Sequence, residues 1–239
     1  MKPSVIFVKI HKWIGLIVGI QVVLWIAGGL YMTWYPIEVV RGEHNMRVVE
    51  PLALNETEGI IPVSEAIAAA GGARIIGLDL GHFLGAPVYR LKRAEGSWLM
   101  VDALSGDILS PISEDKALAL AIADFTGEAK LEGANLLTET NLEYRGDLPV
   151  WQVYLNDEED TRLYVSPALG RVVARRTETW RIFDFFWMLH IMDYEERTNF
   201  NNPLVIVASI VGLVAAVSGL LLIYFRFGKR DFSWLRRRG

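Results

Sequence analysis

The stretch from Trp13 to Tyr35 contains no Asp, Glu, Lys or Arg, and most of its residues are apolar. A helix needs about 20 consecutive apolar residues to cross the hydrocarbon core of a bilayer, which is about 30 Å thick. A second uncharged run occupies residues 203–225, near the other end of the chain. We therefore predict two transmembrane helices, at 13–35 and 203–225, that flank the rest of the sequence.

The charges beside the two apolar runs predict the orientation of the chain. Residues 1–12 contain three lysines and no acid, and residues 226–239 contain six basic residues and one aspartate. Basic residues close to the ends of a span stay on the cytoplasmic side. We expect a cytoplasmic N-terminus (1–12), a basic cytoplasmic tail (226–239) and a periplasmic central domain, in the inner membrane of a bacterium.

A cleaved signal peptide is the alternative to an anchor for the first apolar run. The run is longer than the 7–15 apolar residues usual in signal peptides, and it ends in Thr33-Trp34-Tyr35-Pro36 rather than in a small-x-small cleavage site. We therefore expect an uncleaved anchor.

The central segment is acidic and lacks cysteine. Residues 38–200 contain 15 Lys and Arg against 27 Asp and Glu. An acidic surface repels the nucleic-acid backbone, so we expect no nucleic-acid partner. Without cysteine the chain has no disulfide, no thiolate ligand and no cysteine nucleophile. The segment is long enough for one or two compact domains.

A polar connector (36–60) leads to a pattern that occurs twice, at 61–112 and 113–177. Each copy begins with a helix-forming run and continues with short β-forming runs separated by glycines. Pro87-Val88-Tyr89 in the first copy matches Pro149-Val150-Trp151 in the second. We predict a helix followed by a three-stranded antiparallel meander in each copy. The fold class is then that of an α+β membrane protein, and whether the copies share one sheet or form two stays open.

The segment 178–200 combines aromatic and charged residues. We predict an amphipathic helix in the outer membrane interface, and a helix packed on the domain is the alternative. Aromatic rings favour the headgroup level. The expected interface anchors are Trp34, Tyr35, Trp180, Phe186 and Trp187.

Small residues recur along both apolar runs. Such residues allow membrane helices to approach closely, so we expect the two spans to pack together, with a homodimer through the same faces as the alternative. The small residues that would line this contact are Gly15, Gly19, Gly28, Gly212, Ala216 and Gly219.

Five short motifs occur in order along the chain: His11-Lys12-Trp13-Ile14-Gly15-Leu16, Glu65-Ala66-Ile67, Pro87-Val88-Tyr89, Val101-Asp102-Ala103-Leu104-Ser105-Gly106 and Leu189-His190. Taken together, these motifs resemble the PepSY-associated transmembrane family. The resemblance covers nearly the whole chain and implies an extracytoplasmic interaction or peptidase-regulating domain.

Some larger relatives in this family resemble ferric-siderophore reductases that hold b-type haem with histidines and serve iron uptake. His11 and His190 match family positions and are the candidate haem ligands, although they would lie roughly 30 Å apart near opposite membrane faces. A two-fold dimer could pair each histidine with its mate. Those relatives have about four spans and this chain has two. The alternative is that both histidines are amphipathic anchors.

The sequence offers no catalytic constellation. It contains no His-Glu-x-x-His zinc motif, no Gly-x-Ser-x-Gly elbow and no phosphate-binding glycine loop, so we predict no catalytic residues and no metal site. We expect a non-catalytic module that contacts the bilayer and binds a periplasmic protein or peptide. The alternative is a haem-bearing electron-transfer component for iron reduction, acting as a dimer or with a partner subunit; if the chain is an enzyme, it would be a ferric reductase.

Overall fold

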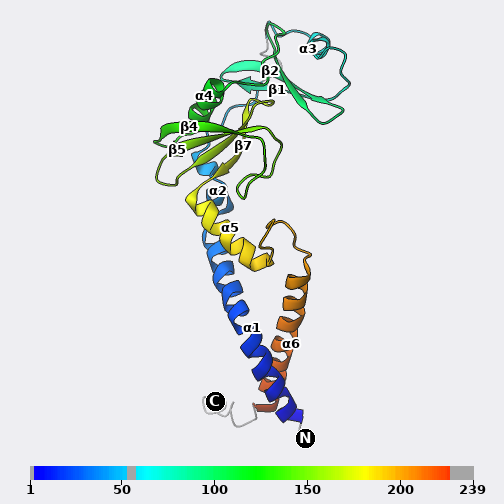
Figure 1. Ribbon diagram of the computed structural model, residues 1–239, viewed down its shortest axis with the longest axis vertical. Helices are drawn as coiled ribbons and strands as arrows, with labels where there is room; N and C mark the ends of the chain where they lie inside the picture. Colours follow the sequence, from blue (N-terminus) through cyan, green and yellow to red (C-terminus); the bar gives the residue numbers. More distant parts are fainter. Residues whose placement is uncertain (1–2, 53–57, 227–239) are drawn as a thin grey trace, which may run out of the picture. The chain divides into compact units, whose positions relative to one another are not determined.

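The computed structural model describes residues 3–52 and 58–226, and the chain divides into two compact units (Figure 1). The helical unit comprises Met1–Tyr35 and Ile182–Gly239, and the sheet unit comprises Pro36–Arg181. The mixture of helices and antiparallel sheets confirms the α+β class.

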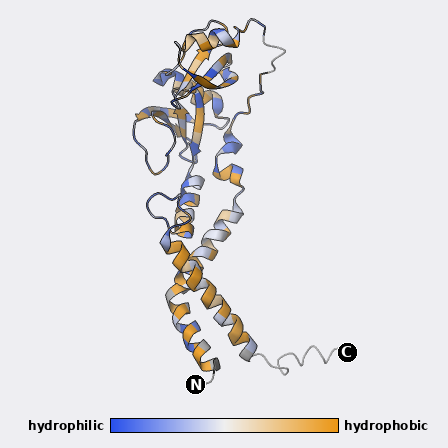
Figure 2. Ribbon diagram, turned by 90° about the vertical axis from the view of Figure 1, so that its right-hand side faces the viewer, coloured by the Kyte–Doolittle hydropathy of each residue, from blue (hydrophilic) through white to orange (hydrophobic). Residues whose placement is uncertain are grey.

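Two long apolar helices dominate the helical unit: α1 (Pro3–Trp34) and α6 (Pro203–Arg226). The Pro203–Tyr224 part of α6 is long and apolar enough to cross a membrane by itself. In α1 the segments Val8–Leu16 and Val18–Trp34 meet this criterion only when counted together, because a bend of 62° separates them. Figure 2 shows that hydrophobic residues predominate along both helices. One membrane helix is therefore supported, and the second span stays a prediction.

Helix α5 (Glu178–Ile191) is shorter than the predicted segment 178–200. It ends because Met192 adopts a left-handed conformation (φ +55°), which terminates helices. Beyond it, the Asp193 carboxylate accepts four backbone N–H groups at 2.9–3.3 Å and folds the chain into a loop. The hydrogen bond from the Asn199 N–H, followed by the others, lowers the pKa of Asp193, which keeps the carboxylate charged.

The sheet unit contains two antiparallel sheets. The first has the order β1 (Ile75–Phe83), β2 (Ala86–Arg93), β3 (Trp98–Asp102) and follows helix α3 (Val63–Ala69). The second follows helix α4 (Glu114–Asp124) and has the order β4 (Lys130–Leu137), β5 (Val150–Asn156), β6 (Arg162–Ser166), β7 (Arg171–Arg176). Two short helices, α2 (Ile37–Val40) and η1 (Glu43–Asn45), precede both sheets.

In the first copy, the segment after Gly106 forms one bridge, between Val101 and Ile108, and no full strand. The backbone N–H of Leu109 still donates to the carbonyl of Met100, but Pro111 has no N–H with which to continue the ladder. The corresponding segment after Gly170 forms the full strand β7. The two copies of the sequence pattern therefore end differently, and the prediction of three strands is wrong for the second copy, which forms four.

One of three buried apolar clusters contains residues from both sheets and from α4. Ala117 and Ala121 of α4 are fully buried, and their small side chains let the helix approach the strands closely. Phe83, Val88 and Met100 come from the first sheet and Val153, Leu155, Leu163 and Val165 from the second. The question that the sequence leaves open is thus answered by two sheets, which both contribute to this cluster.

Gly170, in the turn between β6 and β7, lies close to residues of the first sheet. It has φ +55°, and a Cβ placed there would lie 2.7 Å from the Met100 sulfur and 2.9 Å from the Phe83 ring. Glycine is needed at this position for two reasons. Residues with a side chain disfavour this positive φ, and the structure has no space for a side chain there.

Candidate functional site

The sheet unit carries a largely apolar groove of about 730 Å³, which we call the apolar groove. It lies among the extended connector, the β1–β2 hairpin and the end of α4. Its lining residues are Arg47, Val49, Glu50, Pro51, Leu52, Leu80, Gly81, His82, Leu84, Gly85, Leu120, Ala123 and Asp124.

Leu84 is held in this groove by an unusual turn. Phe83 pairs with Ala86, so Leu84 and Gly85 form a two-residue hairpin loop, and their φ values are +50° and +87°. Such a loop favours Asn-Gly or Gly-Gly, because side chains other than Asn and Asp are strained at positive φ. Leu84 is nevertheless present and 44% exposed. Strain of this kind is a reason to look for a function of the residue.

A second groove, of about 720 Å³, lies along β7, and we call it the cationic groove. Trp98, the loop from Tyr144 to Asp147, the β6–β7 turn and β7 itself line it. Three arginines, Arg145, Arg171 and Arg176, face it together with a single acid, Asp147.

A third groove contains His44 and the acidic run from Asp157 to Glu159. The Asp157 carboxylate accepts the Thr161 N–H and hydroxyl at 2.7 Å each, and Glu159 accepts the N–H and hydroxyl of Thr179. These acids thus stabilise the turn between β5 and β6. Among the described residues, no group of three His, Asp or Glu side chains is arranged to hold a metal ion.

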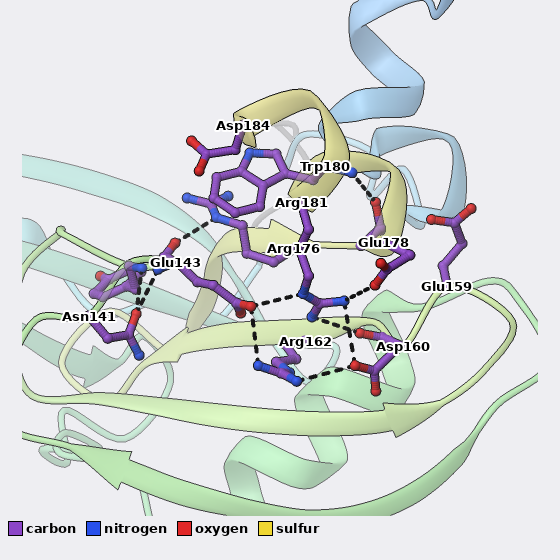
Figure 3. Close-up of polar contacts among 12 residues, drawn as sticks. Asn141, Glu143, Glu159, Asp160, Arg162, Arg176, Glu178, Trp180, Arg181 and Asp184 are labelled. Carbon is purple, nitrogen blue, oxygen red and sulfur yellow. Dashed lines mark hydrogen bonds and ion pairs between the residues drawn. The ribbon is translucent and has the colours of Figure 1, made fainter. Parts of the chain in front are cut away.

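Glu143 is the centre of a polar network that joins the β4–β5 loop to the start of α5 (Figure 3). Its Oε1 accepts from Arg181 Nε at 2.8 Å and from an Arg162 terminal nitrogen at 3.1 Å, and its Oε2 accepts from the Tyr164 hydroxyl at 3.0 Å. Arg176 Nε donates to the Glu143 carbonyl oxygen at 2.6 Å. Sequence reasoning missed this network.

The network fixes the protonation states of its members. Burial alone would raise the pKa of Glu143, but the hydrogen bond and charge of Arg181, with smaller effects of Tyr164 and Arg162, lower it. Burial, together with the Glu143 charge, raises the pKa of Tyr164. Glu143 is therefore ionised and Tyr164 neutral near pH 7, so the pair does not exchange a proton there. The network therefore has a structural role, which is to connect the β4–β5 loop to the start of α5.

The family model for the PepSY-associated TM region matches residues 8–239. The chain belongs to the PepSY-associated TM family. No curated protein and no solved structure matches it. Membership confirms the resemblance drawn from the motifs and makes the chain a membrane-associated PepSY protein that contacts the lipid bilayer.

The histidines at the two family positions of this PepSY-associated chain lie in different places in the helical unit. His11 Nδ1 contacts the Ala215 carbonyl at 3.1 Å and the Ser218 hydroxyl at 3.0 Å, so α1 and α6 are joined there. A carbonyl can only accept, so the Ala215 contact is a hydrogen bond in the tautomer that carries the proton on Nδ1. The Ser218 hydroxyl also donates to the Ala215 carbonyl, at 2.7 Å.

His190 contacts α1 much further along the helix. The Trp25 indole N–H donates to the His190 carbonyl at 3.0 Å, and the two rings are 6.1 Å apart. The 14 residues from His11 to Trp25 correspond to roughly 20 Å of helix. The two imidazoles therefore cannot ligate one haem iron within a chain, and the helical unit has no other histidine. Neither the geometry nor the comparisons support haem or iron uptake.

The predicted small residues occupy different environments. A Cβ on Gly219 would lie 3.1 Å from the His11 ring and one on Gly212 3.9 Å from the Trp25 ring, so both glycines of α6 face α1. Gly28 faces Phe186 of α5 at 3.4 Å. A Cβ on Gly15 or Gly19 would meet nothing within 4 Å, and Ala216 is exposed.

Four of the five aromatic residues proposed as anchors contact other side chains or backbone. The Trp180 ring lies 4.2 Å from the Arg176 guanidinium, and Phe186 packs 5.0 Å from Tyr31. The Trp187 indole donates to the Arg197 carbonyl at 3.0 Å, and Tyr35 lies 5.1 Å from Tyr31. Trp34 is 76% exposed.

Proposed function

We propose that this PepSY-associated protein is a membrane-anchored, non-catalytic binding module. Its sheet unit would receive an extended apolar peptide segment of a partner protein in the apolar groove. The observation that carries this proposal is Leu84, a strained residue whose apolar side chain is kept partly exposed in that groove.

The shape and chemistry of the groove support an extended ligand. Leu80, Leu84 and Leu120 provide apolar contacts from the hairpin and α4, and β1 is an outer strand of its sheet. An outer strand offers backbone hydrogen bonds to an extended peptide, while neighbouring pockets take alternate side chains. The connector adds Val49, which is 62% exposed.

The proposed location follows from the charges that flank the two apolar helices. Both chain ends would be cytoplasmic and the sheet unit periplasmic, with 13–35 and 203–225 as the spans of an inner-membrane protein. The apolar groove would then face periplasmic partners.

Adjacent valines allow a matched test of the groove. Val49 lines it, whereas Val48, which is 81% exposed, does not. The full chain in nanodiscs is screened against displayed random peptides, and binding of the enriched peptides is measured for Val49→Glu and Val48→Glu. A buried carboxylate opposes apolar contacts, so we expect Val49→Glu to weaken binding about tenfold or more and Val48→Glu to have little effect.

Two results would contradict the proposal. One is equal binding by the two variants, or no enriched peptide at all. The other is cleavage of a bound peptide, detected by mass spectrometry after incubation, which would make the module catalytic.

A further inference from the structure

The cationic groove is a second, chemically different surface of the sheet unit. Its three arginines stand out because the surrounding segment, residues 38–200, has 15 basic against 27 acidic residues. On an acidic domain, anionic ligands are repelled by most of the surface. They are attracted only where the arginines are concentrated, so the position of an anionic ligand is restricted to this groove.

Arg171 is the most available cation in this groove. It is the first residue of β7 and is exposed, and among the described residues it takes part in no ion pair within 4 Å. The charge of Arg171 also acts on the buried Arg90. Burial lowers the pKa of Arg90, the charge of Asp79 opposes this change, and the charge of Arg171 lowers the pKa further. Arg171 therefore adds a positive charge to the groove that no ion pair among the described residues offsets.

Ordered aromatic rings form the walls of the groove. Tyr144 stacks on Tyr164 with ring centroids 4.8 Å apart, and its hydroxyl donates to the Asp147 carbonyl at 3.0 Å. The Asn141 side chain accepts the backbone N–H of Tyr144 at 2.7 Å. On the other side, the Lys92 ammonium lies 5.7 Å from the centroid of the Trp98 ring. A wall fixed in this way loses little conformational entropy when a ligand binds.

The position of the groove favours a chain-like ligand. β7 is the outer strand of its sheet, and no strand pairs with its other side within the described residues. Small anions in an open groove stay hydrated and screened by salt, whereas an extended segment makes several contacts at once.

We propose that the cationic groove binds the carboxylates of an acidic peptide segment, with Arg171 as the principal contact. The inference rests on the proposed function in that the ligand is a peptide, but it concerns a different groove. Trp98 would cover the apolar parts of the segment, and β7 would lie alongside its backbone.

The test uses the full chain in detergent and a fluorescein-labelled hexaglutamate peptide, with hexaglutamine as the uncharged probe. Binding is followed by fluorescence anisotropy at two salt concentrations. We expect binding of hexaglutamate that weakens with salt and falls about tenfold or more in Arg171→Glu. Arg74→Glu makes the same charge change at an exposed arginine that does not line the groove, and we expect less than about a twofold effect there.

Three results would overturn the inference. They are absence of hexaglutamate binding, equal losses in the two variants, and equal competition by tripolyphosphate, which would identify a general anion site. If hexaglutamate fails while the peptides of the apolar groove still bind, the proposed function survives and only this inference is wrong. If hexaglutamate binds but no peptide is found for the apolar groove, this inference survives and the proposed function is wrong.

Discussion

Arg90 donates a hydrogen bond from Nε to the backbone carbonyl oxygen of Leu169 at 2.6 Å, and this contact joins the two sheets. Arg90 lies in β2 and Leu169 in the turn before β7. A terminal nitrogen of the same guanidinium donates to the His82 carbonyl at 2.7 Å. Asp79, at 3.3 Å, is half exposed, so solvent weakens its ion pair and the two carbonyl contacts matter most.

Replacing Arg90 should therefore destabilise the sheet unit. Arg90→Met leaves the buried carbonyls without donors, and we expect the free energy of unfolding to fall by about 2–4 kcal/mol. The measurement is chemical unfolding of the full chain in detergent, followed by tryptophan fluorescence. Arg74→Met, at an exposed arginine beside the same sheet, is the control and should change stability by less than about 0.5 kcal/mol. Equal losses of stability in the two variants would show that the Arg90 contacts stabilise the protein no more than an exposed arginine does.

Gly170 allows a separate test of the close approach between the sheets. Gly96 also has a positive φ, +97°, but a Cβ there would meet nothing within 4 Å. Gly170→Ala should destabilise the protein by about 1–3 kcal/mol more than Gly96→Ala, because only Gly170 is packed against Met100 and Phe83. The same unfolding assay measures both variants, and similar losses would show that backbone strain alone explains the effect.

The difficulty of predicting Arg90 from the sequence has a physical cause. In a strand with one buried face, polar and apolar residues alternate, and Arg90 between Tyr89 and Leu91 fits an outward position. In β2, however, Val88, Tyr89, Arg90 and Leu91 are all buried, because both faces of the strand are covered. Without alternation, burial of the arginine cannot be read from the pattern.

Other features were predictable because they are local. The long uncharged runs predict α1 and α6, and the β-forming runs separated by glycines predict antiparallel strands in both copies. His82 lies in β1, since the turn begins only at Leu84. The cationic groove collects residues from β3, the β4–β5 loop and β7, and their proximity depends on tertiary packing alone.

Glu143 should make stability depend on pH. Its folded pKa lies below the unfolded value of about 4.5, so its contribution is complete above that pH and is lost as the pH falls through the folded pKa. Glu143→Gln should therefore lower the unfolding midpoint at pH 7, and the difference from the parent should shrink below about pH 4.5. Glu139→Gln, at an exposed glutamate of the same loop, is the control. A difference that does not vary with pH would contradict the charge-based role.

Replacing Leu84 should make the protein more stable and weaken its binding of peptides. Leu84→Asn relieves the strain of the left-handed position, since Asn-Gly is favoured in this turn, and should raise the free energy of unfolding by about 0.5–1 kcal/mol. The same change removes an apolar side chain from the apolar groove and should weaken the peptides selected on it. Unfolding and binding are measured on one preparation. A variant that is more stable and binds equally well would show that Leu84 does not contact the ligand.

The absence of cysteine permits a direct test of orientation, because one introduced thiol is the only one in the chain. Glu158 is exposed in the acidic turn of the sheet unit, and Lys12 is exposed in the N-terminal part of α1. If basic flanks hold both chain ends in the cytoplasm, a membrane-impermeant maleimide should label Glu158→Cys in intact spheroplasts and Lys12→Cys only after permeabilisation. The reverse pattern would invert the orientation. Labelling of both thiols in intact spheroplasts would mean that the first apolar run does not cross the membrane, and the apolar groove would then still face the outside through the anchor α6 alone.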